Sequence, residues 1–269
     1  MTRSDRGESV LITGGARRIG AALCRALAAD GWFVTIHCNA SASEAEELLS
    51  EIRADGGDGQ VLEADLADDA ALGRIIDRAR DGAPPLRALI NNASVFEHDM
   101  WQDLTGEAID KHHRINLRAP VLLARAFALA LEDDLALEDD HTGCVINLLD
   151  SKIFAMNPDY LSYTLSKSGL YGATQALALA LAPKVRVAGI APGITLESGG
   201  QGVDSFEHSR RLNPLERGCD PEDVARAARF ILDTPSLTGQ IIVIDGGAAL
   251  ANPGRDVAFL SRDDRDAGE

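Results

Sequence analysis

The sequence lacks features that would place it in several other classes of protein. Its four cysteines lie far apart and form no Cys-x-x-Cys pair, which argues against a zinc site or a disulfide framework and predicts reduced thiols. No apolar run is long enough to span a bilayer, and the first six residues carry no apolar signal core. We therefore expect a cytoplasmic protein without a metal site.

Positive charge is also scarce. The chain has 26 Lys and Arg residues against 42 Asp and Glu residues, which gives a net charge of −16 at pH 7. An acidic surface repels nucleic acid and anionic membranes, so we expect a small-molecule substrate and neither of those partners. The apolar content of 45% is ample for a packed core.

Strand and helix patterns alternate along the chain, which is typical of a parallel sheet with helices on both faces. No linker or change in composition divides it. The sequence of 269 residues therefore predicts a single α/β domain, a Rossmann-like doubly wound sheet of about seven strands with its core at about 9–247. The expected strands are Val10–Ile12, Trp32–His37, Val61–Glu63, Ala88–Ile90, Cys144–Leu149, Lys184–Ile190 and Gln240–Ile244. The expected helices are Arg18–Asp30, one capped by Ser41 and Glu44 that ends near Ala54, Asp68–Arg80, Ala108–Leu131, the helix of Tyr163 to about Leu181, and Glu222–Leu232.

Two segments depart from this alternation. The stretch 193–218 is glycine-rich with little apolar pattern, and its length for a connection predicts a mobile lid. The tail, 248–269, contains Pro253 and Gly254 and ends in charged residues. We expect partial disorder there, with docking of Val257–Leu260 on a neighbouring subunit as the alternative.

The segment Thr13–Gly20 is a glycine-rich turn between the first strand and the first helix. Glycines let the backbone approach a pyrophosphate, and the helix N-terminus supplies N–H groups and the positive end of the dipole. The turn therefore predicts a dinucleotide site. Its expected contact residues are Gly14, Arg17, Arg18, Ile19 and Gly20.

The second strand ends in His37, Cys38 and Asn39, without the carboxylate that usually binds a ribose 2′-hydroxyl. Arg17 and Arg18 lie where guanidinium groups can pair with a 2′-phosphate. Both features favour NADPH over NAD, although the arginines are equally compatible with a solvated helix start.

Further cofactor contacts are expected where later strands end, because ligands bind at the carboxyl edge of such sheets. Asp65, followed by Leu66, is placed to accept from the adenine amine or to cap the next helix. Small residues after the fourth strand allow the chain to pass close to the cofactor, and a Pro-Gly pair after the sixth would bracket the nicotinamide. These residues are Asn92, Ala93, Ser94, Pro192 and Gly193.

The most informative residues are Tyr163, Lys167 and Asp150. Tyr163 and Lys167 are four apart and share one face of a helix, so the lysine cation is expected to lower the pKa of the phenol toward neutrality. Asp150 ends the fifth strand, thirteen residues before Tyr163. A carboxyl group beside a tuned phenol predicts a reaction that transfers protons as well as hydride.

In this order, the motifs resemble those of the short-chain dehydrogenase/reductase family. The resemblance covers nearly everything from Ser9 to Gly247, and it rests on the turn at 13–20, Asn-Asn-Ala-Ser at 91–94, Asn116, the Tyr163/Lys167 pair, Pro192-Gly193 and Asp245-Gly246-Gly247. It implies one Rossmann-like domain, a nicotinamide cofactor, a catalytic Tyr–Lys pair and a homo-oligomer, usually a tetramer. It also implies that Asn116 holds a water chain reaching Lys167.

Within that family, an aspartate at position 150, where most members have serine, is similar to the pteridine reductases and dihydromonapterin reductases. The Arg17-Arg18-Ile19-Gly20 turn, His37 and Ser41, and Phe96 after Asn-Asn-Ala-Ser are similar too, whereas Ala40 replaces a common phosphate-binding arginine. The resemblance implies that NADPH reduces a C=N bond of a dihydropterin held between the nicotinamide and Phe96. Tyr163 and Asp150 would supply the proton, and Ser94 and Arg18 would contact polar edges of the pterin.

Other interpretations stay open at this point. The alternative roles are a cap on the loop after its strand for Asp150, packing under the lid for Phe96, and a polar residue that kinks its helix for Asn116. His112 and His113 are read as ordinary surface or packing residues. The alternative functions are an NADPH-dependent ketone reductase, for example of 3-oxoacyl thioesters with Ser151 as the polarising hydroxyl, and a non-catalytic nucleotide-sensing protein.

Overall fold

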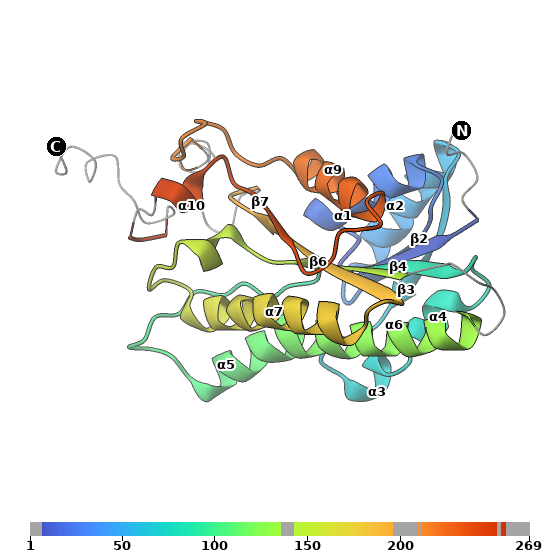
Figure 1. The fold of residues 1–269 in the computed structure, drawn as a ribbon, viewed down its shortest axis with the longest axis horizontal. Helices are drawn as coiled ribbons and strands as arrows, with labels where there is room; N and C mark the ends of the chain where they lie inside the picture. Colours follow the sequence, from blue (N-terminus) through green and yellow to red (C-terminus); the bar gives the residue numbers. More distant parts are fainter. Residues whose placement is uncertain (1–6, 136–142, 196–208, 210, 252–253, 257–269) are drawn as a thin grey trace.

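Seven parallel strands form one sheet in the order β3-β2-β1-β4-β5-β6-β7, with helices on both of its faces (Figure 1). This is a computed structural model, and it describes residues 7–135, 143–195, 209, 211–251 and 254–256. The strand order reverses between β1 and β4, the point at which doubly wound sheets open a crevice for ligands. The predicted fold class is confirmed.

The central strands read as nearly continuous apolar runs because helices cover them on both sides. Val10, Leu11 and Ile12 of β1 are fully buried. The strands are β1 (Ser9–Ile12), β2 (Phe33–Cys38), β3 (Asp58–Glu63), β4 (Leu86–Asn91), β5 (Gly143–Leu148), β6 (Val185–Pro192) and β7 (Ile241–Ile244). All four cysteine thiols are buried and free.

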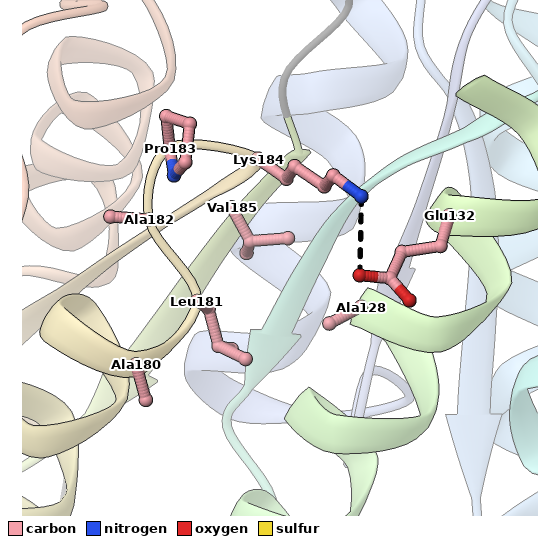
Figure 2. Close-up of a pocket in the computed structure, with 8 residues that line it drawn as sticks. All are labelled: Ala128, Glu132, Ala180, Leu181, Ala182, Pro183, Lys184 and Val185. Carbon is pink, nitrogen blue, oxygen red and sulfur yellow. Dashed lines mark hydrogen bonds and ion pairs between the residues drawn. The ribbon is translucent and has the colours of Figure 1, made fainter. Parts of the chain in front are cut away.

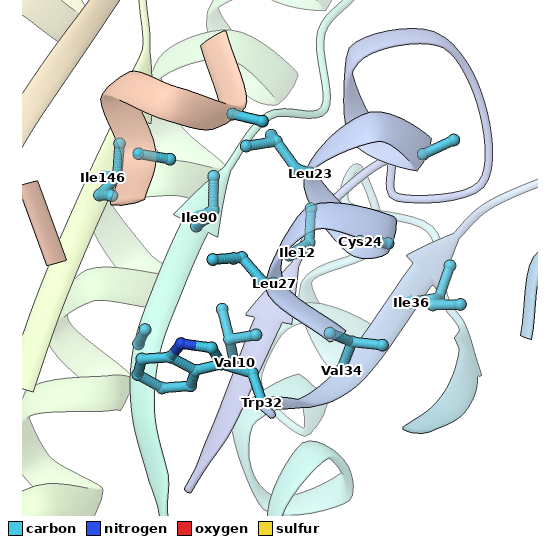
Figure 3. Close-up of a cluster of buried hydrophobic side chains, with 14 of the residues drawn as sticks. Val10, Ile12, Leu23, Cys24, Leu27, Trp32, Val34, Ile36, Ile90 and Ile146 are labelled. Atoms are coloured by element: carbon cyan, nitrogen blue, oxygen red, sulfur yellow. The ribbon is translucent and has the colours of Figure 1, made fainter. Parts of the chain in front are cut away.

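Two apolar clusters hold the helices against the sheet. Figure 3 shows the first cluster, in which Leu23 and Leu27 of α1 pack over strand residues such as Ile12 and Ile90. The helices on this face are α1 (Arg18–Ala29), α2 (Ala42–Ala54) and α9 (Pro221–Leu232). The other side carries α3 (Asp69–Leu72), α4 (Ile75–Arg80), α5 (Gly106–His113), α6 (Ala119–Leu135) and α7 (Leu161–Ala180).

The predicted helix Ala108–Leu131 is in fact three segments. Helix α5 passes into one π-helical turn, Arg114–Arg118, and then into α6, which extends to Leu135. Helix α6 thus continues four residues beyond the predicted end at Leu131, and 136–142 lie outside the described residues. The π turn contains Asn116, whose buried amide makes tertiary hydrogen bonds. Such turns often occur at functional sites.

Two smaller expectations were also wrong. The predicted helix Asp68–Arg80 is split into α3 and α4, because Asp68 caps only a single turn that ends at Gly73. Ser41 makes no capping hydrogen bond to α2, and Glu44 instead faces Arg17 at 3.4 Å. Sequence alone did not reveal that tertiary partner.

The expected lid and tail are described only in part. Residues 196–208 and 210 of the lid, and 252–253 and 257–269 of the tail, lie outside the described residues, and so does Val257–Leu260. The tail begins with the short helix α10 (Ala248–Ala251). In the described part of the chain, no helix combines the length and the apolar character that a bilayer crossing needs.

The packing of α6 on β5 generates a stability prediction. Phe127 is fully buried and lies directly over Gly143, where an added Cβ would collide with its ring. Phe127→Ala is expected to lower the free energy of unfolding by about 3–5 kcal/mol, since it removes buried apolar area and leaves a cavity. Chemical denaturation measures this. The control on the same helix, Leu129→Ala at a 46% exposed position, should change it by less than about 1 kcal/mol.

Candidate functional site

The phenol of Tyr163 donates a 2.7 Å hydrogen bond to Oδ2 of Asp150. Asp150 lies where β5 ends, and its Oδ1 accepts from the backbone N–H of Lys152 at 2.8 Å, at the start of the 3-10 turn Ser151–Phe154. Tyr163 lies in the first turn of α7. One carboxylate therefore has two roles, because Oδ1 caps the 3-10 turn and Oδ2 accepts from the phenol. Ser151, the hydroxyl of the alternative reading, is buried and has no hydrogen bond to the phenol among the described contacts.

Lys167 lies one turn further along α7, with its ammonium 5.7 Å from the centroid of the Tyr163 ring. The ammonium donates to the backbone carbonyl of Leu148 at 2.7 Å. Burial lowers the pKa of Lys167 to about 8. The two side chains thus share a face of the helix, as their spacing predicts.

The expected direction of the Tyr163 pKa was wrong. Its pKa lies well above the usual value, because burial disfavours the phenolate and the Asp150 carboxylate lies beside it. Burial also raises the pKa of Asp150. The phenol therefore keeps its proton and donates it in the hydrogen bond to the carboxylate, while the Lys167 cation favours the charged form of Asp150.

A chain of buried polar side chains fixes α7 to the sheet. Asn91, at the end of β4, donates to Asn147 of β5 at 2.8 Å, and Asn147 donates to Thr174 of α7 at 2.9 Å. Asn147 and Thr174 are fully buried. These buried hydrogen bonds hold the helix in one arrangement on the sheet, so the position of Tyr163 relative to Asp150 is set by the fold.

Asn116 is fully buried and uses both ends of its amide. Its Oδ1 accepts from the backbone N–H of Val95 at 2.8 Å, and its Nδ2 donates to the Val95 carbonyl and to Oγ of Ser166 at 3.1 Å. Ser94 donates to the same Oδ1 at 3.2 Å. Asn116 thus joins the loop after β4 to α7, and no direct contact with Lys167 is among the described hydrogen bonds.

An aromatic cluster lies beside the phenol. Phe96 is 41% exposed, and its ring stands edge-on to that of Tyr163 with 4.7 Å between centroids. Tyr160 stacks on Phe96 at 4.2 Å, with a left-handed backbone at φ 55° just before α7. A non-glycine residue in this region is uncommon and is often found at functional sites. One face of Phe96 is therefore already packed, by a tyrosine that the sequence did not single out.

The sequence also gave no signal for the residues that start α7. Asp99 is buried, and its carboxylate accepts from the backbone N–H of Ser162 at 3.0 Å, which stabilises the positive end of the helix. The Ser162 hydroxyl lies 2.8 Å from Nδ1 of His112. His112, expected to be an ordinary residue, is fully buried and accepts from the backbone of Glu97 through Nε2. It joins the Phe96 loop to α7.

The glycine-rich turn is closed from the end of β4. The side chain of Asn92 donates to the carbonyls of Thr13 and Gly14, each at 2.9 Å, and Thr13 Oγ1 accepts from the backbone N–H groups of Asn92 and Ala93. Gly14 has φ +61° and lies against Ala93. A Cβ on Gly20 would overlap the Gly14 carbonyl. The turn requires glycine at both positions.

The other predicted cofactor residues differ in placement. Arg17 and Arg18 are exposed at the start of α1, whose first turn has no side-chain cap and no acidic residue, and Ile19 is half-buried. His37 is buried behind the turn, where its Nδ1 accepts from the Gly14 N–H at 3.2 Å and burial lowers its pKa to about 4. It supports the turn from inside.

Asp65 and Leu66 follow β3 and play different local roles. Asp65 is exposed and its carboxylate accepts from the backbone of Ala67, while Asp68 caps the next helix. Leu66 is packed in the core. At the end of β6, Gly193 follows Pro192 and would collide with Asp245 if it carried a Cβ. All these residues lie at the carboxyl edge of the sheet.

The opposite edge holds a small pocket beside the start of β6 (Figure 2). Lys184 and Glu132 form an exposed ion pair across it at 3.2 Å. It is lined by Ala128, Glu132, Ala180, Leu181, Ala182, Pro183, Lys184 and Val185. None of these residues contacts the Tyr163 site. Among the described residues, no cluster of three or more His, Cys, Asp or Glu side chains is arranged to hold a metal ion.

A family model described as short chain dehydrogenase matches residues 8–205. The chain belongs to the short-chain dehydrogenase family. It is therefore an oxidoreductase, and the alternative of a non-catalytic sensor is not supported.

Relatives within the short-chain dehydrogenase family include several named activities. The crystal structure of FolM alternative dihydrofolate reductase 1 from Brucella suis, in complex with NADP, is 40% identical, with a TM-score of 0.84 over 93% of this chain and 97% of that one. Pteridine reductase 1 of Leishmania tarentolae is 27% identical over 93% of this chain and 99% of its own. A 3-oxoacyl-[acyl-carrier-protein] reductase of Synechocystis is 29% identical over 89% and 96%. The resemblance to the pteridine reductase subgroup is thus confirmed, alongside relatives that act on ketones.

The Tyr163–Asp150 contact predicts a spectroscopic effect of Asp150→Asn. The neutral amide removes the negative charge that favours the protonated phenol, so the pKa of Tyr163 should fall below its wild-type value. A pH titration of tyrosinate absorbance measures the shift, and Tyr163→Phe identifies the transition among the three tyrosines. An unchanged or higher pKa in Asp150→Asn would contradict the described contact.

Proposed function

We propose that the protein is an NADPH-dependent reductase that reduces a C=N bond of a dihydropterin. The observation that carries this proposal is the Asp150 carboxylate at 2.7 Å from the Tyr163 phenol. Reduction of C=N requires protonation of a ring nitrogen as hydride arrives, and a carboxyl–phenol pair suits that task better than a serine hydroxyl. The similarity to a dihydrofolate reductase and a pteridine reductase supports the same substrate class.

The turn after β1 fits a dinucleotide phosphate. The uncapped first turn of α1 offers backbone N–H groups and the positive end of the helix dipole, and the absence of Cβ atoms at Gly14 and Gly20 keeps the turn tight. Arg17 and Arg18 are exposed beside it, and the 3.4 Å pair of Arg17 with Glu44 is a weak surface contact that a 2′-phosphate can replace. NADP in the similar structures supports NADPH as the cofactor, which supplies the hydride when bound.

The chain's own residues would manage the proton. Tyr163 holds the proton that it donates in the hydrogen bond to Asp150, and burial raises the pKa of the carboxyl, which makes it a better proton acceptor when the proton is replaced. Release of one proton to a ring nitrogen leaves negative charge on the pair. Lys167, one turn along α7, stabilises that charge by its proximity.

Phe96 would provide the wall against which the pterin ring stacks. Its ring is partly exposed and stands edge-on to Tyr163, so a flat ring lying on it has its edge near the phenol. Ser94 is exposed at the same edge of the sheet, and Arg18 is exposed at the start of α1. Both would contact polar groups of the substrate or the cofactor. Asn116 would contribute indirectly, because it holds the backbone of Val95 beside Phe96.

Reduction of a ketone is the second candidate, since a 3-oxoacyl reductase is among the relatives. A homotetramer remains a prediction. It is supported by an exposed stripe on α7, formed by Leu165, Gly172, Ala176 and Leu179, which suits close helix packing. Gly169, in contrast, packs on Leu117 within the domain.

Asp150→Asn tests the proposed chemistry. Turnover of dihydrobiopterin, followed by NADPH oxidation, should fall by at least about 100-fold, because the amide can neither accept nor relay the proton. The affinity for NADPH, measured by fluorescence titration, should stay within about twofold. The control is Asp58→Asn, the same exchange at an exposed position where β3 begins, and it should leave both quantities unchanged.

Two results would count against the proposal. Unchanged pterin turnover in Asp150→Asn would remove the carboxylate from the chemistry. Efficient reduction of acetoacetyl thioester by the wild-type protein, without any reduction of dihydropterins, would establish the ketone alternative.

The nucleotide turn can be tested by a pair of glycine substitutions. Gly20→Ala places a Cβ against the Gly14 carbonyl and should weaken NADPH binding by at least about tenfold, because the turn must open. Gly106→Ala adds a Cβ where no atom lies within 4 Å, at the start of α5. It should leave NADPH binding intact and hold or raise the melting temperature. Equal affinities in the two variants would argue against nucleotide binding at this turn.

A further inference from the structure

The tail segment Gly254–Asp256 returns to the start of α7, about a hundred residues earlier in the chain. Asp159 is fully buried, and the guanidinium of Arg255 donates to both of its oxygens, at 2.8 and 2.9 Å. The backbone N–H of Asp256 donates to the same carboxylate at 2.8 Å. A buried carboxylate that receives three such donors anchors the segment firmly, because its charge would be costly without them.

The Arg255–Asp159 contact positions the neighbouring residue, Asp256, for a second ion pair. The ammonium of Lys152 lies 3.1 Å from Oδ2 of Asp256, and the side chains are only 8% and 20% exposed. The same ammonium lies 5.1 Å from the centroid of the Tyr160 ring, within range of a cation–π contact. Asp256 is therefore the counterion of a nearly buried lysine.

The Lys152–Asp256 pair is connected to the proposed reaction centre by two routes. Through the backbone, the N–H of Lys152 donates to the Asp150 carboxylate that accepts from Tyr163. Through the aromatic cluster, Lys152 lies over Tyr160, which stacks on Phe96. The tail thus contacts, through Lys152 and Tyr160, the aromatic cluster against which the substrate ring is proposed to lie.

The sign of the charge presented there depends on Asp256. With the carboxylate in place, the Lys152 ammonium is neutralised and offers little attraction to an anion. Without it, Lys152 would lose its ion-pair partner and keep only the electrostatic influence of Asp150 and Asp159, so the ammonium would attract negative charge more strongly.

We propose that Asp256 is a specificity-determining residue which, by neutralising Lys152 at the wall of the substrate site, makes the site favour an uncharged ring over an anionic one. Arg255 and Asp159 are the positioning residues that hold Asp256 there. This inference rests on the proposed function for the location of the substrate, and it adds a charge criterion for the substrate class.

The test compares two fluorescent pterins, uncharged biopterin and anionic pterin-6-carboxylate, as ligands of the full-length protein loaded with NADP⁺. For Asp256→Asn, the ratio of the anionic to the neutral Kd should fall by at least about tenfold from the wild-type value. Arg255→Gln should shift the ratio in the same direction, because it releases the tail. The double variant Lys152→Met/Asp256→Asn should return the ratio to near the wild-type value, since the attracting cation is gone.

Glu132→Gln is the matched control, because it removes a carboxylate from the Lys184 ion pair at the opposite edge of the sheet (Figure 2). It should leave the ratio unchanged. The affinity for NADP⁺ should also be unchanged in Asp256→Asn. A ratio in Asp256→Asn within twofold of wild type, or a shift that persists in the double variant, would overturn the inference.

The two proposals fail in different ways. Biopterin binding without turnover of dihydrobiopterin counts against the proposed function, while the Kd ratio still decides the inference. If the wild-type protein binds neither pterin, acetoacetate and its ethyl ester serve as the anionic and neutral pair, read out as KM for NADPH oxidation. A protein that accepts neither pair overturns the inference.

Discussion

The contact between the Tyr163 phenol and the Asp150 carboxylate depends on how a helix packs on the sheet, because the two residues belong to successive elements and lie 13 residues apart. Asp150 is placed by the end of β5, and Tyr163 by the first turn of α7. The buried Asn91–Asn147–Thr174 chain fixes the helix to the sheet, so the 2.7 Å distance follows from the whole packing arrangement. Two other features of the site support this contact. They are the Asp99 cap on α7 and the loop after β4 that the Asn116 amide holds.

Buried charge is the second organising feature. An acidic protein holds two lysines in its interior beside the reaction centre, Lys152 and Lys167, and one buried carboxylate, Asp159, that pairs with the half-exposed Arg255. Lys152 and Arg255 each face a carboxylate from a distant part of the chain, and Lys167 lies near Asp150. Because unpaired charge in such surroundings is costly, these partners restrict how the elements can be arranged. The same buried ion pairs therefore set the charge of the site and limit the movement of its elements.

The sequence predicted the sheet and the approach of Asp150 to Tyr163, because both follow from short-range rules: alternation of strands and helices, ligand-binding edges, and residues four apart on a helix. It missed what depends on long-range packing. The Arg255–Asp159 contact joins residues 96 apart, and nothing in either local sequence marks it. The raised pKa of Tyr163 depends on burial, which spacing does not reveal. The single helix expected at 108–131 failed because only the tertiary bonds of Asn116 distinguish a π turn from ordinary helix.

That π turn separates two tasks on one continuous stretch of helix. A residue added to a helix rotates everything after it by about 100°, since 3.6 residues complete a turn. Helix α5 can therefore orient His112 toward the Phe96 loop while α6 points Phe127 into the core, although a regular helix would tie the two orientations together. A change in the orientation of α5 can therefore be accommodated without a change in how α6 packs in the core. Deletion of one residue within 114–118 would join α5 and α6 as one regular helix. Either His112 or Phe127 would then point in the wrong direction.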